Sequence, residues 1–164
     1  MTQEEKAISF ETLKHIRQVT TLLNKIIVEL LFRADIHDQS KLEEPELSTF
    51  LKYTPKLADS IYGSEEYNSF LKSMSSALEH HYSHNRHHPE YFKNASKEKS
   101  YIDSMNLIDI IEMLCDWKAA SMRHKEGDIM RSIAINKERF GISDQLESIL
   151  KNTVSLFCDC DENT

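Results

Sequence analysis

Hydrophobic residues recur with a helical period along most of the chain. Between Ser9 and Arg33 the apolar positions form one stripe, which predicts a first helix over these residues. His15 and Gln18 flank this stripe instead of lying opposite it. The stripe consists of Leu13, Ile16, Val19, Leu23, Ile26, Ile27, Leu30 and Leu31.

Turn-forming residues divide the next part of the chain. A short helical segment is expected to carry His37-Asp38 and to end near Lys41. The following helix tolerates Pro45 in its first turn, and Thr54-Pro55 breaks its pattern. Ser64 is then expected to cap a helix that delivers the pair His80-His81 at its C-terminal end.

The rest of the chain continues this helical pattern after one long connection. Residues 84–99 are polar and predict a loop. Further helices are expected over residues 101–124 and 129–140 and after the cap Ser143-Asp144, with Gly141 closing the second of them. The pattern therefore predicts six or seven helices.

Composition supports an all-α fold in a single domain. The 164 residues include only three glycines and three prolines, whereas Leu, Ile, Lys, Glu, Met and Ala dominate, and these residues favour helix. Residues 1–157 are expected to form one helical bundle. Residues 158–164 are acidic and are expected to be a disordered tail.

Charge and hydropathy exclude several classes of function. The net charge is −7 and no basic stripe is present, which argues against binding to long nucleic acids. No apolar run reaches the roughly 18 residues of a membrane span, and the polar start lacks a signal-peptide pattern. The three cysteines form no disulfide framework. We therefore expect a cytoplasmic protein, and whether it forms a homo-oligomer is left open.

The histidines suggest a metal centre. Seven of the eight lie in three places, each with a carboxylate nearby: His15, His37 beside Asp38, and the run His80, His81, His84, His87 and His88. Further along, Asp109, Glu112 and Asp116 recur at i, i+3 and i+7, so they share one face of a helix. Imidazole and carboxylate are ligands of divalent metals, so the sequence predicts a site for one or two ions of Mn²⁺, Fe²⁺, Mg²⁺ or Zn²⁺.

Three motifs carry a resemblance to a known superfamily. They are His37-Asp38-x-Ser40-Lys41, His80-His81-x-x-x-Asn85-x-His87-His88-Pro89-Glu90-Tyr91 and Glu112-Met113-x-x-Asp116-Trp117-x-Ala119-Ala120. With them the chain resembles the HD superfamily of metal-dependent phosphohydrolases. It is most similar to a family of small HD-like proteins of unassigned function in bacteria and phages. The resemblance covers residues 15–153 and implies an HD-like helical bundle.

A weaker similarity, to HD-type cyclic-dinucleotide phosphodiesterases, implies roles for individual residues. The implied metal ligands are His15, His37, Asp38, His80, His81 and Asp116. Lys41 would lie near the phosphate and would act with Asp38 in catalysis. The chain departs from that pattern, because Tyr82 replaces a glutamate, Asn85 replaces an aspartate and the Gly-Tyr-Pro element is absent. The cyclic-dinucleotide activity itself is therefore not expected.

Other polar residues have more than one interpretation. Asn85 and Arg86 are expected to contact substrate from the loop. His87 and His88 could be substrate contacts, additional metal ligands or part of a solvated turn. Asp109 and Glu112 could be ligands, could orient ligand histidines from behind, or could be polar surface.

Two functions follow from this set. The first is a metal-dependent phosphohydrolase acting on a nucleotide or another small phosphate ester. The second is a non-catalytic HD-like protein that binds or sequesters a nucleotide.

Overall fold

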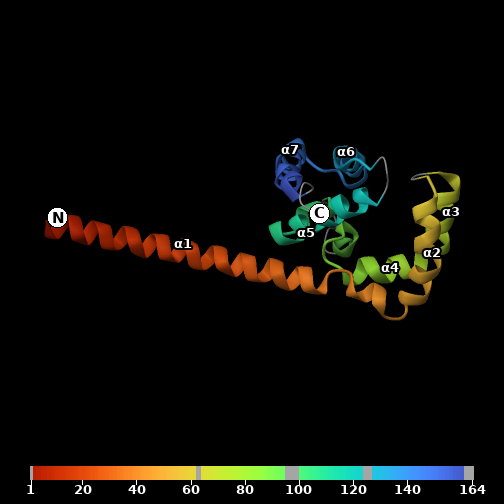
Figure 1. The fold of residues 1–164 in the computed structure, drawn as a ribbon, viewed down its shortest axis with the longest axis horizontal. Coiled ribbons are helices and arrows are strands. Elements are labelled where there is room, and N and C mark those ends of the chain that lie inside the picture. Colours follow the sequence, from red (N-terminus) through yellow and green to blue (C-terminus); the bar gives the residue numbers. More distant parts are fainter. Residues whose placement is uncertain (1, 62–63, 95–99, 124–126, 161–164) are drawn as a thin grey trace. The chain divides into compact units, whose positions relative to one another are not determined.

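The chain is all-α, as predicted. The computed structural model describes residues 2–61, 64–94, 100–123 and 127–160, with side chains as far as Phe157, and within these residues it contains seven α-helices and no strand (Figure 1). The α-helices are α1 (Gln3–Ile36), α2 (Leu47–Asp59), α3 (Glu65–Ser73), α4 (Ser75–His84), α5 (Leu107–Met122), α6 (Ile129–Phe140) and α7 (Asp144–Val154). Short 3₁₀ helices are η1 (Gln39–Leu42), η2 (Pro89–Phe92), η3 (Tyr101–Ser104) and η4 (Ser155–Cys160).

Contacts along the chain define two compact units, Met1–His37 and Asp38–Thr164. The sequence pattern predicts one domain and gives no sign of a division at this point. In the expected tail, η4 extends to Cys160, and residues 161–164 lie outside the described part of the chain.

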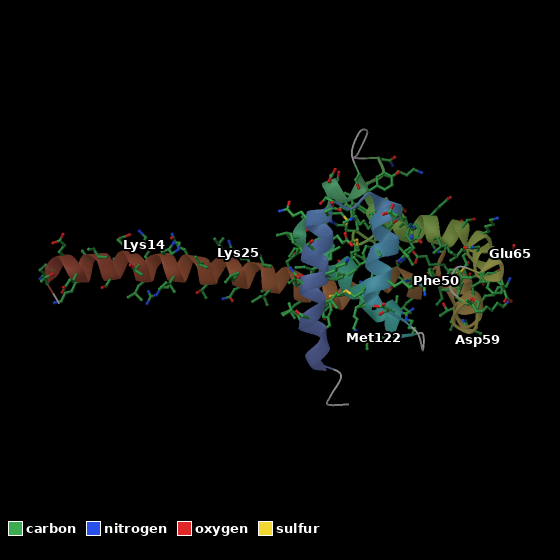
Figure 2. All side chains as sticks on the ribbon, turned by 90° about the horizontal axis from the view of Figure 1, so that it is seen from above. Lys14, Lys25, Phe50, Asp59, Glu65 and Met122 are labelled. Atoms are coloured by element: carbon green, nitrogen blue, oxygen red, sulfur yellow. The ribbon has the colours of Figure 1, made fainter. Side chains whose placement is uncertain are left out.

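The first unit consists of the single long helix α1. It begins six residues before the predicted start because Thr2 and Glu5 form a capping box, each side chain bonding to the other's backbone N–H. Lys14 and Lys25 are labelled on this helix in Figure 2. None of the described helices, α1 included, has the length and apolar character needed to cross a membrane.

The hydrophobic core of the second unit lies among α5, α6 and α7. Its buried members are Ile102, Met113, Leu114, Trp117, Ile129, Ile133, Ile142, Leu150 and Val154. Trp117 stacks on Phe140, with the ring centroids 6.5 Å apart and the planes 7° from parallel. Trp117 is therefore a core residue, and its packing fixes one side of α5.

Three predicted helix boundaries in the other half of this unit differ from the structure. Pro45, expected in the first turn of its helix, precedes α2, which begins at Leu47 after the N-cap Glu46. Pro55 lies inside α2 and does not end it. Pro55 and Leu51 are both exposed, so the Leu51 carbonyl that loses its helical partner can still bond to water. The helix expected after Ser64 is divided at Met74 into α3 and α4, and Ser64 caps α3 as predicted.

The C-terminal helices agree closely with the prediction. α6 spans the expected residues and ends at Gly141, which has φ 65° in the left-handed region. Ser143 caps α7 by accepting a hydrogen bond from the Leu146 N–H. α5 is shorter than expected, because η3 and a separate cap at Asn106 precede it.

Candidate metal centre

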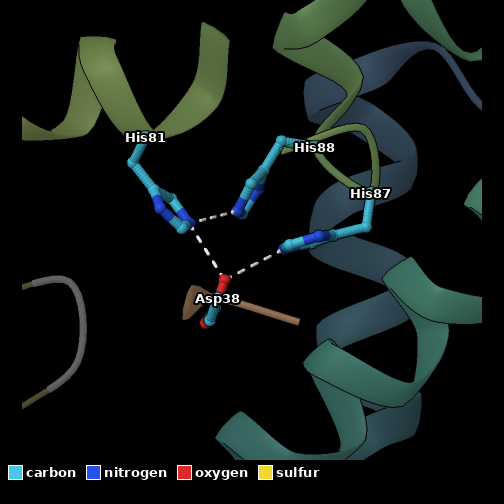
Figure 3. A group of neighbouring side chains, drawn as sticks. All are labelled: Asp38, His81, His87 and His88. Atoms are coloured by element: carbon cyan, nitrogen blue, oxygen red, sulfur yellow. Dashed lines mark hydrogen bonds and ion pairs between the residues drawn. The ribbon is translucent and has the colours of Figure 1, made fainter. Parts of the chain in front are cut away.

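Four side chains of the second unit converge on a small volume. Asp38, His81, His87 and His88 each offer a ligand atom, and these atoms lie within 4.8 Å of one another (Figure 3). Oδ1 of Asp38 lies 3.2 Å from Nε2 of His81 and 3.5 Å from Nε2 of His87. Nε2 of His81 lies 2.9 Å from Nε2 of His88. The group therefore contains three imidazoles and one carboxylate.

The turn after α4 places all three histidines. His81 lies in the last turn of α4, and the chain turns back at Asn85, the C-cap residue. Pro89 forces His88 into an extended conformation (φ −89°, ψ 126°), as predicted, and then begins η2. Since α4 and η2 lie against each other, His87 and His88 return to the side of His81.

Asp38 reaches the group through an unusual backbone conformation. Its φ is 56° and its ψ is 14°, a left-handed conformation that aspartate tolerates better than most residues. η1 follows directly, and Lys41 in it donates to Oδ2 of Asp38. Oδ2 of Asp38 thus faces the Lys41 ammonium group, while Oδ1 faces His81 and His87.

A buried glutamate lies behind His81. Glu46 is 0% exposed, and its Oε2 lies 2.9 Å from Nδ1 of His81. Its Oε1 lies 2.7 Å from Nδ1 of His80, and Ser40 Oγ donates to Oε2 at 3.1 Å. Glu46 was not among the predicted site residues, because Glu43, Glu44 and Glu46 look alike around Pro45 and nothing local in the sequence distinguishes the buried one.

A second carboxylate lies behind His87. Oε1 of Glu112 is 3.0 Å from Nδ1 of the buried His87, whose Nε2 faces Asp38. Glu112 belongs to α5, so the packed core determines its position. Of the three interpretations of Glu112, this geometry matches the one in which it orients a histidine from behind.

Asn85 connects the turn after α4 that carries His87 and His88 (the histidine turn) to η1. Its Nδ2 donates to the His81 carbonyl at 2.8 Å and to Ser40 Oγ at 2.8 Å. Both amide hydrogens are therefore used within the chain, and Asn85 contributes no charge to the group.

Arg86 holds the same turn against α5. Its Nε and Nη2 donate to the two oxygens of Asp109 at 3.1 and 2.9 Å. This interaction raises the pKa of Arg86, with burial acting in the opposite direction. Asp109 is fully buried and also forms the capping box of α5 with Asn106. The geometry gives both residues a structural role.

His88 is kept in its neutral form. Burial first, and then the nearby His87 and His81, lower its pKa to about 2. The neutral imidazole is the form that binds a metal ion. Tyr82, whose ring centroid lies 4.7 Å from that of His88, has a raised pKa, chiefly because of burial.

The remaining predicted ligands are not members of the four-residue group. His15 lies on α1 and His37 is the C-cap of that helix, so both belong to the first unit. His80 points away from the four-residue group, toward Glu46, and stacks on His84 with the ring centroids 3.9 Å apart. Asp116 is half-buried, and a carboxylate oxygen of it lies within 4.8 Å of one of Asp38.

The donor set fits a divalent ion. With metal–nitrogen bonds of about 2.0–2.1 Å, tetrahedral ligand atoms are about 3.3 Å apart. Three of the six distances among these ligand atoms are 2.9, 3.2 and 3.5 Å, and all six are within 4.8 Å. If the carboxylates behind His81 and His87 accept their Nδ1 protons, both Nε2 lone pairs face the Asp38 carboxylate, an electron-rich arrangement that favours a cation.

The fold and this group define an all-α protein with a histidine–aspartate cluster that could hold a metal ion. The chain belongs to a family described as "Family of unknown function (DUF5662)", whose model matches residues 4–156. No curated protein and no solved structure matches the chain.

Proposed function

We propose that this protein is an HD-type, metal-dependent phosphohydrolase that acts on a nucleotide or another small phosphate ester. The observation that carries the proposal is the convergence of Asp38 Oδ1 with three imidazole nitrogens, two of them backed by carboxylates. Imidazole nitrogen and carboxylate oxygen are the ligand types that divalent ions such as Zn²⁺ and Mn²⁺ take in proteins. The HD resemblance of the sequence supports the same chemistry.

The residues of the group would hold the ion and orient the water next to it. His81, His87, His88 and Asp38 are the proposed ligands, with Asp116 close enough to Asp38 to join them. A bound divalent ion would supply a polarised phosphoryl oxygen and a water that ionises near neutral pH. The choice among Mn²⁺, Fe²⁺, Mg²⁺ and Zn²⁺ stays open for this mixed donor set.

Lys41 is the proposed contact for the phosphate. Its ammonium group donates to Asp38, and its side chain remains 28% exposed. An ammonium group has three hydrogens, so it can bond a phosphate oxygen without releasing Asp38. Asn85 and Arg86, which were expected to contact substrate, are bonded within the chain and are not needed for this proposal.

A substrate screen tests the proposal. Nucleotides, cyclic dinucleotides and generic phosphate esters would be incubated with the full chain and each of the four metals. Asp38→Asn is the matched inactive variant, since asparagine tolerates the left-handed backbone of Asp38 but lacks its charge. Exposed Glu43→Gln is the control. Release of phosphate by wild type and Glu43→Gln, with a loss of at least about 100-fold in Asp38→Asn, is expected. Equal activity in all three would rule out catalysis at this group.

The alternative function is a non-catalytic protein that binds or sequesters a nucleotide. The observation that favours it is the position of Asn85, which donates both amide hydrogens internally where the compared phosphodiesterases have an acid. Calorimetry on Asp116→Asn separates the two functions. A catalyst should lose turnover far more than ground-state affinity. A wild-type protein that binds a nucleotide tightly and returns it unaltered with metal present would establish the alternative.

Two finer predictions from the sequence are untested. A cytoplasmic location can be tested by fractionation. Self-association of the chain can be tested by light scattering of the purified full chain.

A further inference from the structure

The buried carboxylate of Glu46 contacts three side chains at once. Its partners are His81, His80 and Ser40, at 2.9, 2.7 and 3.1 Å. A carboxylate with 0% exposure is stable in a folded protein only if hydrogen-bond donors surround it. This requirement determines the direction of each bond in the network.

Counting hydrogens shows which nitrogen of His81 carries the proton. The two hydrogens of Asn85 Nδ2 go to the His81 carbonyl and to Ser40 Oγ. The single Ser40 hydrogen then goes to Glu46 Oε2. Neither Asn85, whose Nδ2 lies 3.0 Å from Nδ1 of His81, nor Ser40, whose Oγ lies 3.2 Å from it, then has a hydrogen left for that nitrogen. Nδ1 of His81 must therefore donate to Glu46.

We infer that Glu46 is a positioning residue that fixes the Nδ1–H tautomer of His81 and thereby directs the Nε2 lone pair of His81 to the metal. This inference rests on the metal site proposed above. In a neutral imidazole only one nitrogen carries hydrogen, so the partner of Nδ1 decides what Nε2 can do. With Nδ1 protonated, Nε2 of His81 is a ligand; with Nε2 protonated, it is not.

The contact to His80 has a separate role. The His80 side chain is 33% exposed and lies outside the four-residue group, so water can replace its bond to Glu46. His81 is buried and has no such replacement. Glutamine at position 46 could therefore keep its one oxygen toward Ser40 and His81 and turn its NH₂ toward His80. Methionine, whose thioether is only a weak acceptor, would leave both histidines without this hydrogen bond.

The experiment uses four forms of the full chain: wild type, Glu46→Met, Glu46→Gln and the exposed control Glu43→Met. In ¹⁵N-labelled protein treated with chelator, long-range ¹H–¹⁵N spectra identify the protonated nitrogen of His81. Calorimetry with Zn²⁺ and Mn²⁺ then measures affinity. We expect Nδ1–H and similar affinity in wild type, Glu46→Gln and Glu43→Met. Glu46→Met should lose this tautomer and bind metal about 10–100-fold more weakly.

Several outcomes would overturn the inference. It fails if Glu46→Met retains the Nδ1–H tautomer, or if its metal affinity equals that of Glu43→Met. It also fails if Glu46→Gln is as weak as Glu46→Met, since charge and not hydrogen-bond acceptance would then be responsible. If Glu46→Met does not fold, Glu46→Asp replaces it, because the shorter side chain withdraws the oxygens from His81.

The metal proposal and the positioning role can fail separately. If wild type binds neither metal but shows the expected tautomers in all forms, the metal site is refuted and the role of Glu46 in orienting His81 stands. If wild type binds metal and the tautomer of His81 does not respond to position 46, the metal site stands and the role of Glu46 is refuted.

Discussion

Adjacent histidines in this chain have different chemical surroundings. His80 and His81 are about 100° apart around α4, as successive helical residues must be. Glu46 contacts both through Nδ1, but only His81 directs its other nitrogen toward Asp38 and His88. The sequence could not distinguish the two, because the distinction depends on the segment around Glu46, more than thirty residues away.

The first prediction concerns this pair. His81→Ala should reduce metal affinity by more than about 100-fold, beyond the range for a residue that only orients a ligand. His80→Ala should cost less than about tenfold, since it removes one of the three donors to Glu46 and no member of the group. Calorimetric titration of both variants with Zn²⁺ provides the measurement. A larger loss in His80→Ala than in His81→Ala would contradict the geometry described here.

At the residue scale the sequence predicted some members of the converging group. Asp38 and His81 were expected as ligands and lie in the converging group, and Glu112 contacts a histidine from behind. For His87 and His88 the alternatives were substrate contacts, additional ligands or part of a solvated turn, and the structure brings both into the group. Only the turn after α4 reveals this, because it folds residues six and seven positions after His81 back beside it. The ligation by His15 and His37 stays a prediction.

At the scale of elements, the histidine turn depends on α5 for its position. Arg86 bonds to the buried Asp109 at the start of α5, and its guanidinium lies over Tyr91 and Phe92, 5.3 and 5.0 Å from the ring centroids. Glu112, one turn further along α5, bonds to His87. One well-packed helix thus holds the turn through two carboxylates.

The second prediction separates this structural role of Arg86 from substrate binding. Arg86→Met leaves Asp109 buried without its bidentate partner and should lower the free energy of unfolding by about 2–3 kcal/mol. Arg86→Lys should recover only part of this lost stability, because a lysine ammonium cannot bond both Asp109 oxygens in the bidentate geometry of a guanidinium. Urea denaturation measures the loss. Unchanged stability with a raised KM for the substrate would instead show that Arg86 contacts the ligand.

The third prediction concerns the end of α6. Gly141 has φ 65°, and a Cβ added there would meet Ser100 at 3.9 Å, an ordinary contact. Gly141→Ala should therefore cost about 1 kcal/mol through backbone strain alone. Glu138→Ala, at an exposed position in the same helix, is the control, and it should be neutral or slightly stabilising because alanine is the better helix former. Equal melting temperatures for the two variants would contradict the strain argument.

Element boundaries were predictable where local chemistry determines them. The ends of α6 and the start of α7 follow from Gly141 and Ser143, whose effects extend only a few residues. Pro55 was misleading because its cost depends on exposure, which the sequence does not contain. The division at Met74 was also missed: Met74 is buried, and its apolar side chain continues the helical pattern across the break.

At the scale of the whole molecule, the all-α architecture followed from composition and periodicity, but the division into two units did not. The division falls between His37 and Asp38, inside the motif that carries the resemblance to HD proteins. Sequence adjacency suggested that these residues act together. The structure determines the surroundings of Asp38 within the second unit, and these surroundings support the final prediction.

The fourth prediction is that metal stabilises the folded chain. Since the group exists only when η1, α4 and the following turn are folded together, an ion that binds it selects the native state. At a free concentration 100 times the Kd, the expected gain is about 2.7 kcal/mol. Thermal melts with chelator and with increasing Zn²⁺ or Mn²⁺ measure it. His81→Ala should melt at the same temperature in both conditions, whereas exposed Glu43→Gln should behave as wild type. A wild-type melting temperature that does not respond to either metal would show that hydrogen bonds alone hold these histidines together.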